Sequence, residues 1–98
     1  MLFVTRFTWD PRKAAKVARE HGIRFEDIQD IFRDPFAVEF FDEQHSDAED
    51  RYGIIGLTAA YGLIYLAFVE TSNEIRFVTA RRAETWMVRD YEQKRSRT

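Results

Sequence analysis

The feature that most limits the fold is an uninterrupted run of seven hydrophobic residues at positions 63–69. A helix that spans a bilayer needs about 18 apolar residues or more, so this run predicts a central β-strand covered on both faces. Strand patterns at residues 51–58 and 74–80 flank it, and short turns at residues 59–62 and 71–73 join the three. Turns this short connect antiparallel neighbours, so we expect an antiparallel meander.

The N-terminal third of the chain predicts a strand followed by a helix. Residues 2–8 are rich in Phe, Val and Thr, which is typical of a strand. Asp10 and Pro11 suit the N-cap and the first position of a helix over residues 11–20. Gly22 suits the left-handed turn that ends such a helix.

The next segments switch from a helical pattern to strands. Residues 25–33 carry apolar side chains at helical spacing and predict a second short helix, which Asp34-Pro35 ends. Residues 36–41 predict another strand, and residues 42–50 form a polar loop that leads into the meander.

A last helix is predicted over residues 82–94, with the basic residues 94–98 as a frayed, flexible tail. The order of elements therefore predicts one α+β domain over residues 1–98. Two N-terminal helices and one C-terminal helix pack against one curved antiparallel sheet of four to five strands.

Composition narrows the function classes. The chain of 98 residues has a net charge of −2, so an RNA-binding surface requires a local cluster of cations. It has no cysteine, which excludes disulfides and thiolate zinc sites and suits the cytoplasm. The two histidines are far apart in sequence and no Gly-rich phosphate loop is present, so we expect no metal and no cofactor. No membrane association is expected.

Two segments carry the residue types of a catalytic site. Residues 42–51 contain a histidine, a serine, several carboxylates and an arginine, and residues 75–82 end in two adjacent arginines. Cleavage of a phosphodiester without a metal needs a base, an acid and fixed cations for the developing negative charge. The candidate catalytic residues are His45, Glu49, Arg51, Arg81 and Arg82, and the candidate RNA-binding residues are Arg76 and Trp9.

Short motifs follow one another in a fixed order along nearly the whole chain. They are Trp9-Asp10-Pro11-x-Lys13-Ala14, His21-Gly22, Phe32-x-Asp34-Pro35, Asp42-x-x-His45-Ser46-x-x-Glu49-x-Arg51, Ile75-Arg76-x-x-x-Ala80-Arg81-Arg82 and Asp90-Tyr91-Glu92. This ordered set resembles the BrnT family of toxins from bacterial type II toxin–antitoxin pairs.

The resemblance implies a RelE-like ribonuclease fold and an arrest of translation through RNA cleavage. It also implies neutralisation by a small BrnA-like antitoxin that carries the DNA-binding part, in an assembly such as a dimer of heterodimers. By motif match, the implied site residues are His45, Glu49, Arg51, Arg76, Arg81 and Arg82.

The chain departs from the family pattern at three places: Gly62-Leu63, Val69-Glu70-Thr71 and Trp86-Met87-Val88-Arg89. Two expected cations and one expected carboxylate are absent there. A second reading therefore stands beside the ribonuclease: a toxin relative without catalysis, which binds an antitoxin and acts as a co-repressor module. Trp86, Met87 and Val88 are adjacent on a helix and cannot all be buried, which favours a protein-binding surface.

Several site residues have two readings from sequence alone. His45 either moves protons or caps a turn together with Ser46, and Glu49 with Arg51 is either an acid/base pair or a surface salt bridge. Trp9 either stacks on an RNA base or belongs to the core. Arg76 lies five residues before Arg81, so a regular strand places the two on opposite faces and a bulge changes that.

Overall fold

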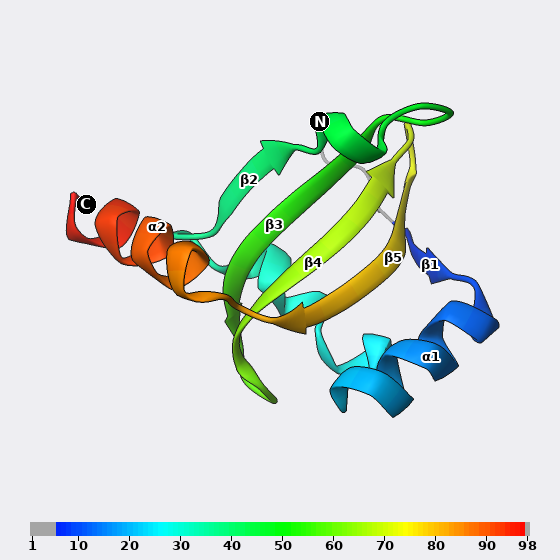
Figure 1. Cartoon of the computed structure of the whole chain (residues 1–98), viewed down its shortest axis with the longest axis horizontal. Helices are drawn as coiled ribbons and strands as arrows, with labels where there is room; N and C mark the ends of the chain where they lie inside the picture. Colours follow the sequence, from blue (N-terminus) through cyan, green and yellow to red (C-terminus); the bar gives the residue numbers. More distant parts are fainter. Residues whose placement is uncertain (1–5, 98) are drawn as a thin grey trace.

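The computed structural model describes residues 6–97, which form one layer of strands with helices on both sides (Figure 1). The elements in chain order are β1 (Arg6–Trp9), α1 (Pro11–His21), the 3₁₀ helices η1 (Phe25–Asp27) and η2 (Gln29–Arg33), β2 (Val38–Phe41), the 3₁₀ helix η3 (Glu43–His45), β3 (Arg51–Thr58), β4 (Gly62–Glu70), β5 (Glu74–Arg82) and α2 (Thr85–Ser96).

The sheet has the strand order β1-β5-β4-β3-β2. Strands β2 to β5 form the predicted antiparallel meander, whereas β1 pairs with β5 in parallel. The sheet is therefore mixed, and the expectation of a purely antiparallel sheet is wrong at this edge. The helices after β1 carry the chain to the far edge of the sheet, and the meander returns to β1 in the same direction. Residues 2–5 of the predicted first strand lie outside the described residues.

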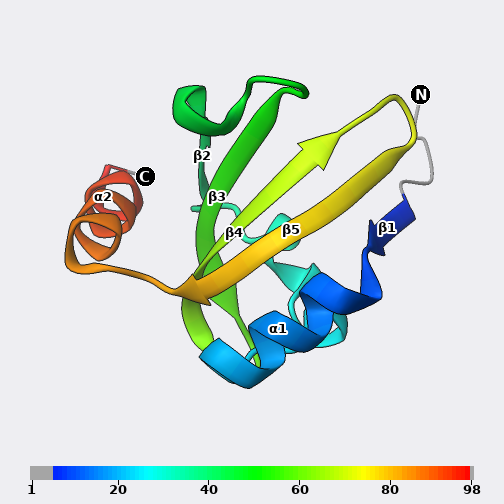
Figure 2. The ribbon, with the colours of Figure 1, turned by 45° about the vertical axis from the view of Figure 1, so that its right-hand side comes forward.

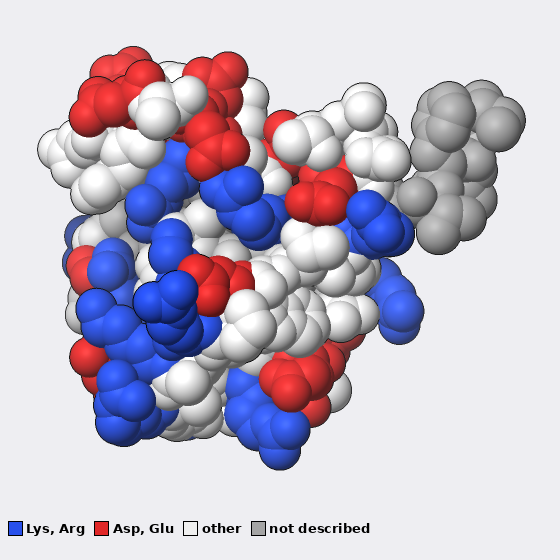
Figure 3. All heavy atoms as spheres, turned by 90° about the vertical axis from the view of Figure 1, so that its right-hand side faces the viewer, with Lys and Arg blue, Asp and Glu red and all other residues white. Residues whose placement is uncertain are grey.

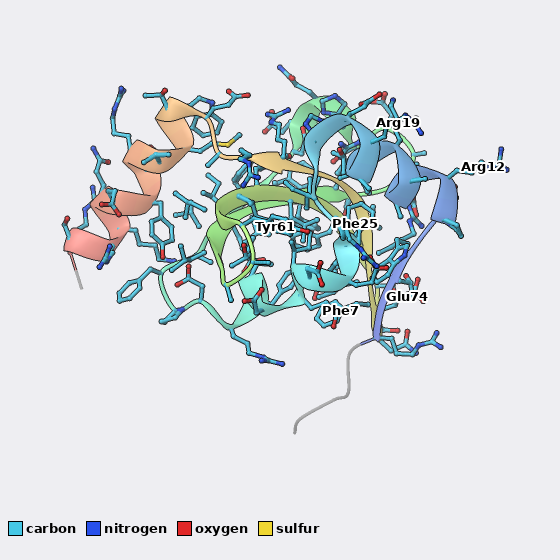
Figure 4. The ribbon with its side chains drawn as sticks, turned by 90° about the horizontal axis from the view of Figure 1, so that it is seen from below. Phe7, Arg12, Arg19, Phe25, Tyr61 and Glu74 are labelled. Atoms are coloured by element: carbon cyan, nitrogen blue, oxygen red, sulfur yellow. The ribbon has the colours of Figure 1, made fainter. Side chains whose placement is uncertain are left out.

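The two faces of the sheet are covered differently. One face packs against α1, η1 and η2, where Phe25, Phe77 and Phe68 are nearly fully buried and Phe7 joins the ring cluster (Figure 4). On the other face, Met87 and Tyr91 of α2 pack near β2 and β3 (Figure 2). Helix α2 lies at one end of that face, which leaves the other end for the loop between β2 and β3.

Helix α1 begins at the predicted residue and ends one residue later than predicted, at His21. The Asp10 carboxylate accepts a hydrogen bond of 2.9 Å from the Arg12 N–H, and Pro11 occupies the first helical position. Gly22 has a φ of 68° and donates its N–H to the Ala18 carbonyl, as a left-handed C-cap does. His21 is the last residue of the helix, which fits a structural role.

The second predicted helix is wrong in type, because residues 25–33 form the two short 3₁₀ helices η1 and η2. Phe25, Ile28 and Ile31 are fully buried, and they are spaced three residues apart. Ile28 joins the two 3₁₀ helices with a φ of −124°, so the three side chains reach the core from η1, from the junction and from η2. The sequence pattern resembles that of an α-helix, because repeats of 3.0 and 3.6 residues per turn are hard to distinguish over only two turns.

The final helix differs from its prediction at both ends. It begins at Thr85, because Glu84 acts as the N-cap after β5 has continued to Arg82. It continues to Ser96, so Lys94, Arg95 and Ser96 are helical and the frayed tail predicted from residue 94 does not begin there. The Lys94 ammonium donates to the Ala37 carbonyl and ties the helix to the segment before β2.

Candidate functional site

The strand register places three of the predicted arginines on one face of the sheet. Arg51 of β3 and Arg76 of β5 are both paired with Val69 of β4, one on each side. Arg81 is paired with Tyr65, four residues from Val69 on the same strand. Side chains an even number of residues apart on a strand point to the same face, so Arg51, Arg76 and Arg81 share one face.

A β-bulge makes this arrangement possible. Ala67 is paired with Thr79 and Phe68 with Phe77, so Val78 is an extra residue on β5. Without it, Arg76 and Arg81 would point to opposite faces because they are five residues apart. Of the two alternatives in the sequence analysis, the bulge is therefore the one found, and it brings both cations to the same side.

A cavity of about 260 Å³ opens on this face beneath the loop between β2 and β3. Its wall comes from three parts of the chain: the loop, the strands β3 to β5, and helix α1. The lining residues are Lys13, His45, Asp47, Ala48, Glu49, Arg51, Val69, Arg76 and Val78. Four of the predicted site residues, His45, Glu49, Arg51 and Arg76, thus meet at one place.

His45 is oriented by a carboxylate that the sequence analysis did not assign to the site. Its Nδ1 lies 2.9 Å from Oδ2 of Asp42, and the Arg51 Nε lies 3.6 Å from the same oxygen. The Asp42 side chain is 14% exposed and the His45 side chain 57%. A proton on Nδ1 shared with the carboxylate leaves Nε2 as the basic nitrogen.

Ser46 fixes the loop that carries His45. Its hydroxyl donates to the Asp42 carbonyl at 2.6 Å and accepts from the Arg51 N–H at 2.9 Å. The Asp42 N–H also donates to the Arg51 carbonyl at 2.8 Å. Ser46 therefore caps the turn, as one of the two interpretations expects. The His45 imidazole instead faces the cavity.

Glu49 pairs with Arg76 rather than with Arg51. Both of its carboxylate oxygens accept from the guanidinium, one at 3.2 Å. These hydrogen bonds hold the pKa of Glu49 below its usual range and raise that of Arg76. Glu49 is therefore ionised and engaged with a cation, which suits it to orient Arg76 better than to carry a proton.

Arg81 and Arg82 are separated by the sheet. The Arg81 guanidinium lies 5.0 Å from the centre of the Tyr65 ring and 3.1 Å from Oε2 of Glu84. Arg82 lies over the Tyr61 ring at 5.7 Å and donates to the Tyr61 carbonyl at 3.1 Å. Arg81 is on the face of the cavity, and Arg82 is on the other face.

Trp9 lies with the core and not with the cavity. Its ring contacts Phe77 at 5.6 Å and Phe25 at 5.7 Å between ring centres. These rings belong to the cluster beneath α1, on the opposite face from His45. The packing therefore favours the core reading of Trp9 over base stacking.

Three residues near the site were missed from sequence. Asp42 precedes His45 by three residues, a spacing that signals contact in a helical turn. Lys13 belongs to the first of the ordered motifs but was not assigned to the site, and only the packing of the helix brings it to the cavity. Tyr65 was read only as one of the hydrophobic residues of the central strand. In the structure its ring lies over Gly53, where an added Cβ would come within 2.6 Å of it.

Tyr65 links the cations of this face. Its side chain is buried, and burial together with the charge of Asp42 raises its pKa, while Arg51 and Arg81 act in the opposite direction. All three charges are thus close enough to act on one phenol. The ring contacts the Arg81 guanidinium and reaches Gly53, which lies two residues from Arg51 on β3.

Among residues 6–97 there is no group of three or more His, Cys, Asp or Glu side chains that could hold a metal ion. Within the same described range, no helix is both long and apolar enough to cross a membrane.

Comparison with known proteins decides the family. The family model described as the ribonuclease toxin BrnT of type II toxin–antitoxin systems matches residues 9–85. The chain belongs to the BrnT family. Membership implies an antitoxin partner, since the family is one half of a toxin–antitoxin pair. The match runs from the last residue of β1 to the first residue of α2, and so includes every residue that lines the cavity.

Structural comparison agrees with the family assignment at the level of the fold. The chain is similar to the crystal structure of the ribonuclease toxin BrnT from Brucella abortus, with a TM-score of 0.66 and 21% sequence identity. The similarity covers 84% of this chain and 100% of that chain. No curated protein matches the sequence.

Proposed function

We propose that this BrnT-family chain cleaves RNA without a metal or cofactor, through attack of a 2′-hydroxyl on the adjacent phosphate. The observation that carries the proposal is the Asp42 carboxylate, which contacts both His45 Nδ1 and Arg51, two residues that line the cavity together with Arg76. A base oriented by a carboxylate and fixed cations are the parts that this reaction needs.

His45 Nε2 accepts the proton of the 2′-hydroxyl while the 2′-oxygen bonds to phosphorus. The bond from phosphorus to the 5′-oxygen breaks, and the leaving oxygen takes a proton from solvent. Arg51 and Arg76 hold the phosphate oxygens as negative charge develops on them. The products are a 2′,3′-cyclic phosphate and a 5′-hydroxyl.

The other candidate residues take narrower roles in this proposal. Glu49 orients Arg76 through their paired hydrogen bonds. Arg81 supplies a cation at the α2 end of the same face, whereas Arg82 is left out because it lies on the other face.

We also propose the finer features that family membership suggests. The fold is RelE-like, the antitoxin is BrnA-like, and the toxin reaches DNA only through that antitoxin. A dimer of heterodimers is the proposed assembly, and cytoplasmic RNA is the proposed substrate, so its cleavage arrests translation.

The proposal is tested with purified protein and single-stranded RNA in the presence of EDTA. Wild type and the control variant His21→Ala are expected to produce 2′,3′-cyclic phosphate ends. His45→Ala is expected to lose about 10²–10⁴-fold in cleavage rate, the usual contribution of general acid–base catalysis. Equal rates for His45→Ala and wild type would refute the role of His45, and loss of all activity in EDTA would refute metal independence.

A second function is favoured by exposed apolar side chains. Trp86 and Val88 of α2, Phe41 of β2 and Leu57 of β3 are all exposed. Such residues are typical of a protein-binding surface. If the purified chain leaves RNA intact and still binds its antitoxin, the non-catalytic co-repressor module is the correct reading.

A further inference from the structure

We propose that Lys13 and Lys16 of α1 form a second phosphate subsite, which holds the RNA backbone next to the phosphate that is cut. This inference rests on the proposed function, since it extends the same groove. The ligand class is the phosphodiester of a single-stranded nucleic acid.

A second cavity of about 190 Å³ adjoins the first. Its lining residues are Lys13, Lys16, Val17, Glu20, Arg51, Val78 and Thr79. Lys13, Arg51 and Val78 line both cavities, so the two form one continuous groove between α1 and the sheet. The groove is therefore longer than a single phosphate requires.

The cations in the two halves of the groove differ in whether a carboxylate of the protein already contacts them. Arg51 and Arg76 each contact a carboxylate of the protein, Asp42 and Glu49. Neither Lys13 nor Lys16 forms an ion pair with any residue in the described range 6–97. Lys13 acts on Glu49 only through its field, which helps to lower the pKa of that carboxyl. The two ammonium groups are thus free to bind an external anion.

The lysines are held in place by a well-anchored helix. Lys13 and Lys16 are three residues apart, so they lie on the same side of α1 one turn apart. Val17 beside them is 3% exposed and fixes this side of the helix against the sheet. Figure 3 shows Lys and Arg side chains gathered on the side of the molecule that carries α1, with Asp and Glu around them. Among the lining residues, Glu20 supplies a negative charge, which disfavours phosphate beside it.

Other cations of α1 provide a matched control. Arg12 and Arg19 are exposed on the same helix and line neither cavity, and Arg12 extends away from the sheet (Figure 4). The variants Lys13→Gln/Lys16→Gln and Arg12→Gln/Arg19→Gln therefore remove the same charge from the same helix, once inside the groove and once outside it.

The experiment measures binding of a single-stranded decanucleotide with 2′-O-methyl groups, which cannot be cut, at several salt concentrations. Each phosphate contact in a single strand contributes about 0.7 to the slope of log K against log salt. Loss of two contacts in Lys13→Gln/Lys16→Gln is expected to reduce the magnitude of the slope by about 1.4. The arginine control is expected to keep the wild-type slope.

The outcomes separate this inference from the proposed function. A slope reduced equally in both double variants, or in neither, overturns the subsite, and so does an absence of RNA binding by wild type. A reduced slope confined to the lysine variant supports the subsite even if RNA carrying 2′-hydroxyls is not cleaved, which refutes only the proposed catalysis. Thermal unfolding of each variant is expected to match wild type, because the substituted side chains are exposed.

Discussion

At the scale of single residues, Arg81 and Arg82 show how a strand divides neighbours. They are adjacent in sequence, yet one lies over Tyr65 and the other over Tyr61 on opposite faces. Alternation along a strand predicts this division, but it does not say which arginine faces the site. The bulge at Val78 decides it, because it places Arg81 on the face that carries Arg51 and Arg76.

The two arginines therefore form a matched pair of substitutions. Arg81→Ala is expected to lower RNA cleavage by about 10²–10³-fold, as the loss of one group that stabilises the developing charge does. Its stability is expected to fall by no more than about 1 kcal/mol, because the cation–π contact with Tyr65 is partly exposed. Arg82→Ala is expected to cleave at the wild-type rate. Cleavage assays beside thermal melts measure both, and a reversed order would place the site on the other face.

At the scale of elements, the sequence was informative where a local rule decides the outcome. The N-cap Asp10, the C-cap Gly22 and the limits of β3 were predicted because caps and turn residues act within a few positions. The helix type of η1 and η2 was not predicted, because a spacing of three residues over a short segment fits both a 3₁₀ helix and an α-helix. The parallel pairing of β1 was not predictable either, because it depends on where the helices deliver the chain.

The contact between α2 and the rest of the domain makes a prediction at this scale. The Tyr91 hydroxyl donates to Asp34 at 2.7 Å, and Asp34 also accepts from the N–H groups of Phe36 and Leu57. Burial, together with the bond to Asp34, raises the pKa of Tyr91 to about 12. Burial alone would raise the pKa of Asp34, but these hydrogen bonds outweigh it and the pKa lies below its usual range.

Because the two pKa shifts have opposite signs, Tyr91 loses its contribution to stability at high pH and Asp34 loses its contribution at low pH. The contribution of Tyr91 is complete below its unfolded pKa of about 10 and is lost as the pH rises through about 12. The contribution of Asp34 is complete above its unfolded pKa of about 3.9 and is lost as the pH falls through its lower folded value.

Tyr91→Phe is expected to lower the free energy of unfolding at pH 7 by about 1.5–3 kcal/mol, the usual value of a hydrogen bond to a charged group. The variant is also expected to lose the decline in stability between about pH 10 and 12 that Tyr91 causes. Urea unfolding across this pH range measures both effects. Tyr52→Phe is the control, because that hydroxyl makes no hydrogen bond with any residue of the described range. An equal pH dependence in Tyr91→Phe and wild type would contradict the assignment.

At the scale of the whole molecule, the candidate site shows the limit of reading function from sequence. His45, Glu49, Arg51 and Arg76 were predicted because motif and residue type mark them, and they line one cavity. Lys13 and Asp42 were missed, since their role depends on the packing of α1 and on the turn of η3. The residue types of a site are visible in sequence, whereas the partners that orient them come from the fold.

The distribution of charge and apolar surface also separates two regions of the molecule. The basic groove lies between α1 and the sheet, whereas Trp86 and Phe40 contact each other where α2 meets the edge strand β2. An unpaired strand edge beside exposed aromatic side chains is suited to a protein partner. We therefore expect the antitoxin to bind at α2 and β2.

This placement is tested by Trp86→Ala. The side chain is exposed, and the hydrogen bond from its indole to Glu84, at 3.0 Å, is exposed as well. The loss of the side chain is therefore expected to change the stability of the free protein little. If Trp86 is a central contact, affinity for the antitoxin falls by about 2 kcal/mol, or roughly thirtyfold in Kd. Calorimetric titration with the antitoxin measures this, and Arg89→Ala on the same helix is the control. Unchanged affinity in Trp86→Ala would place the antitoxin elsewhere and leave the exposed apolar residues of α2 without a partner.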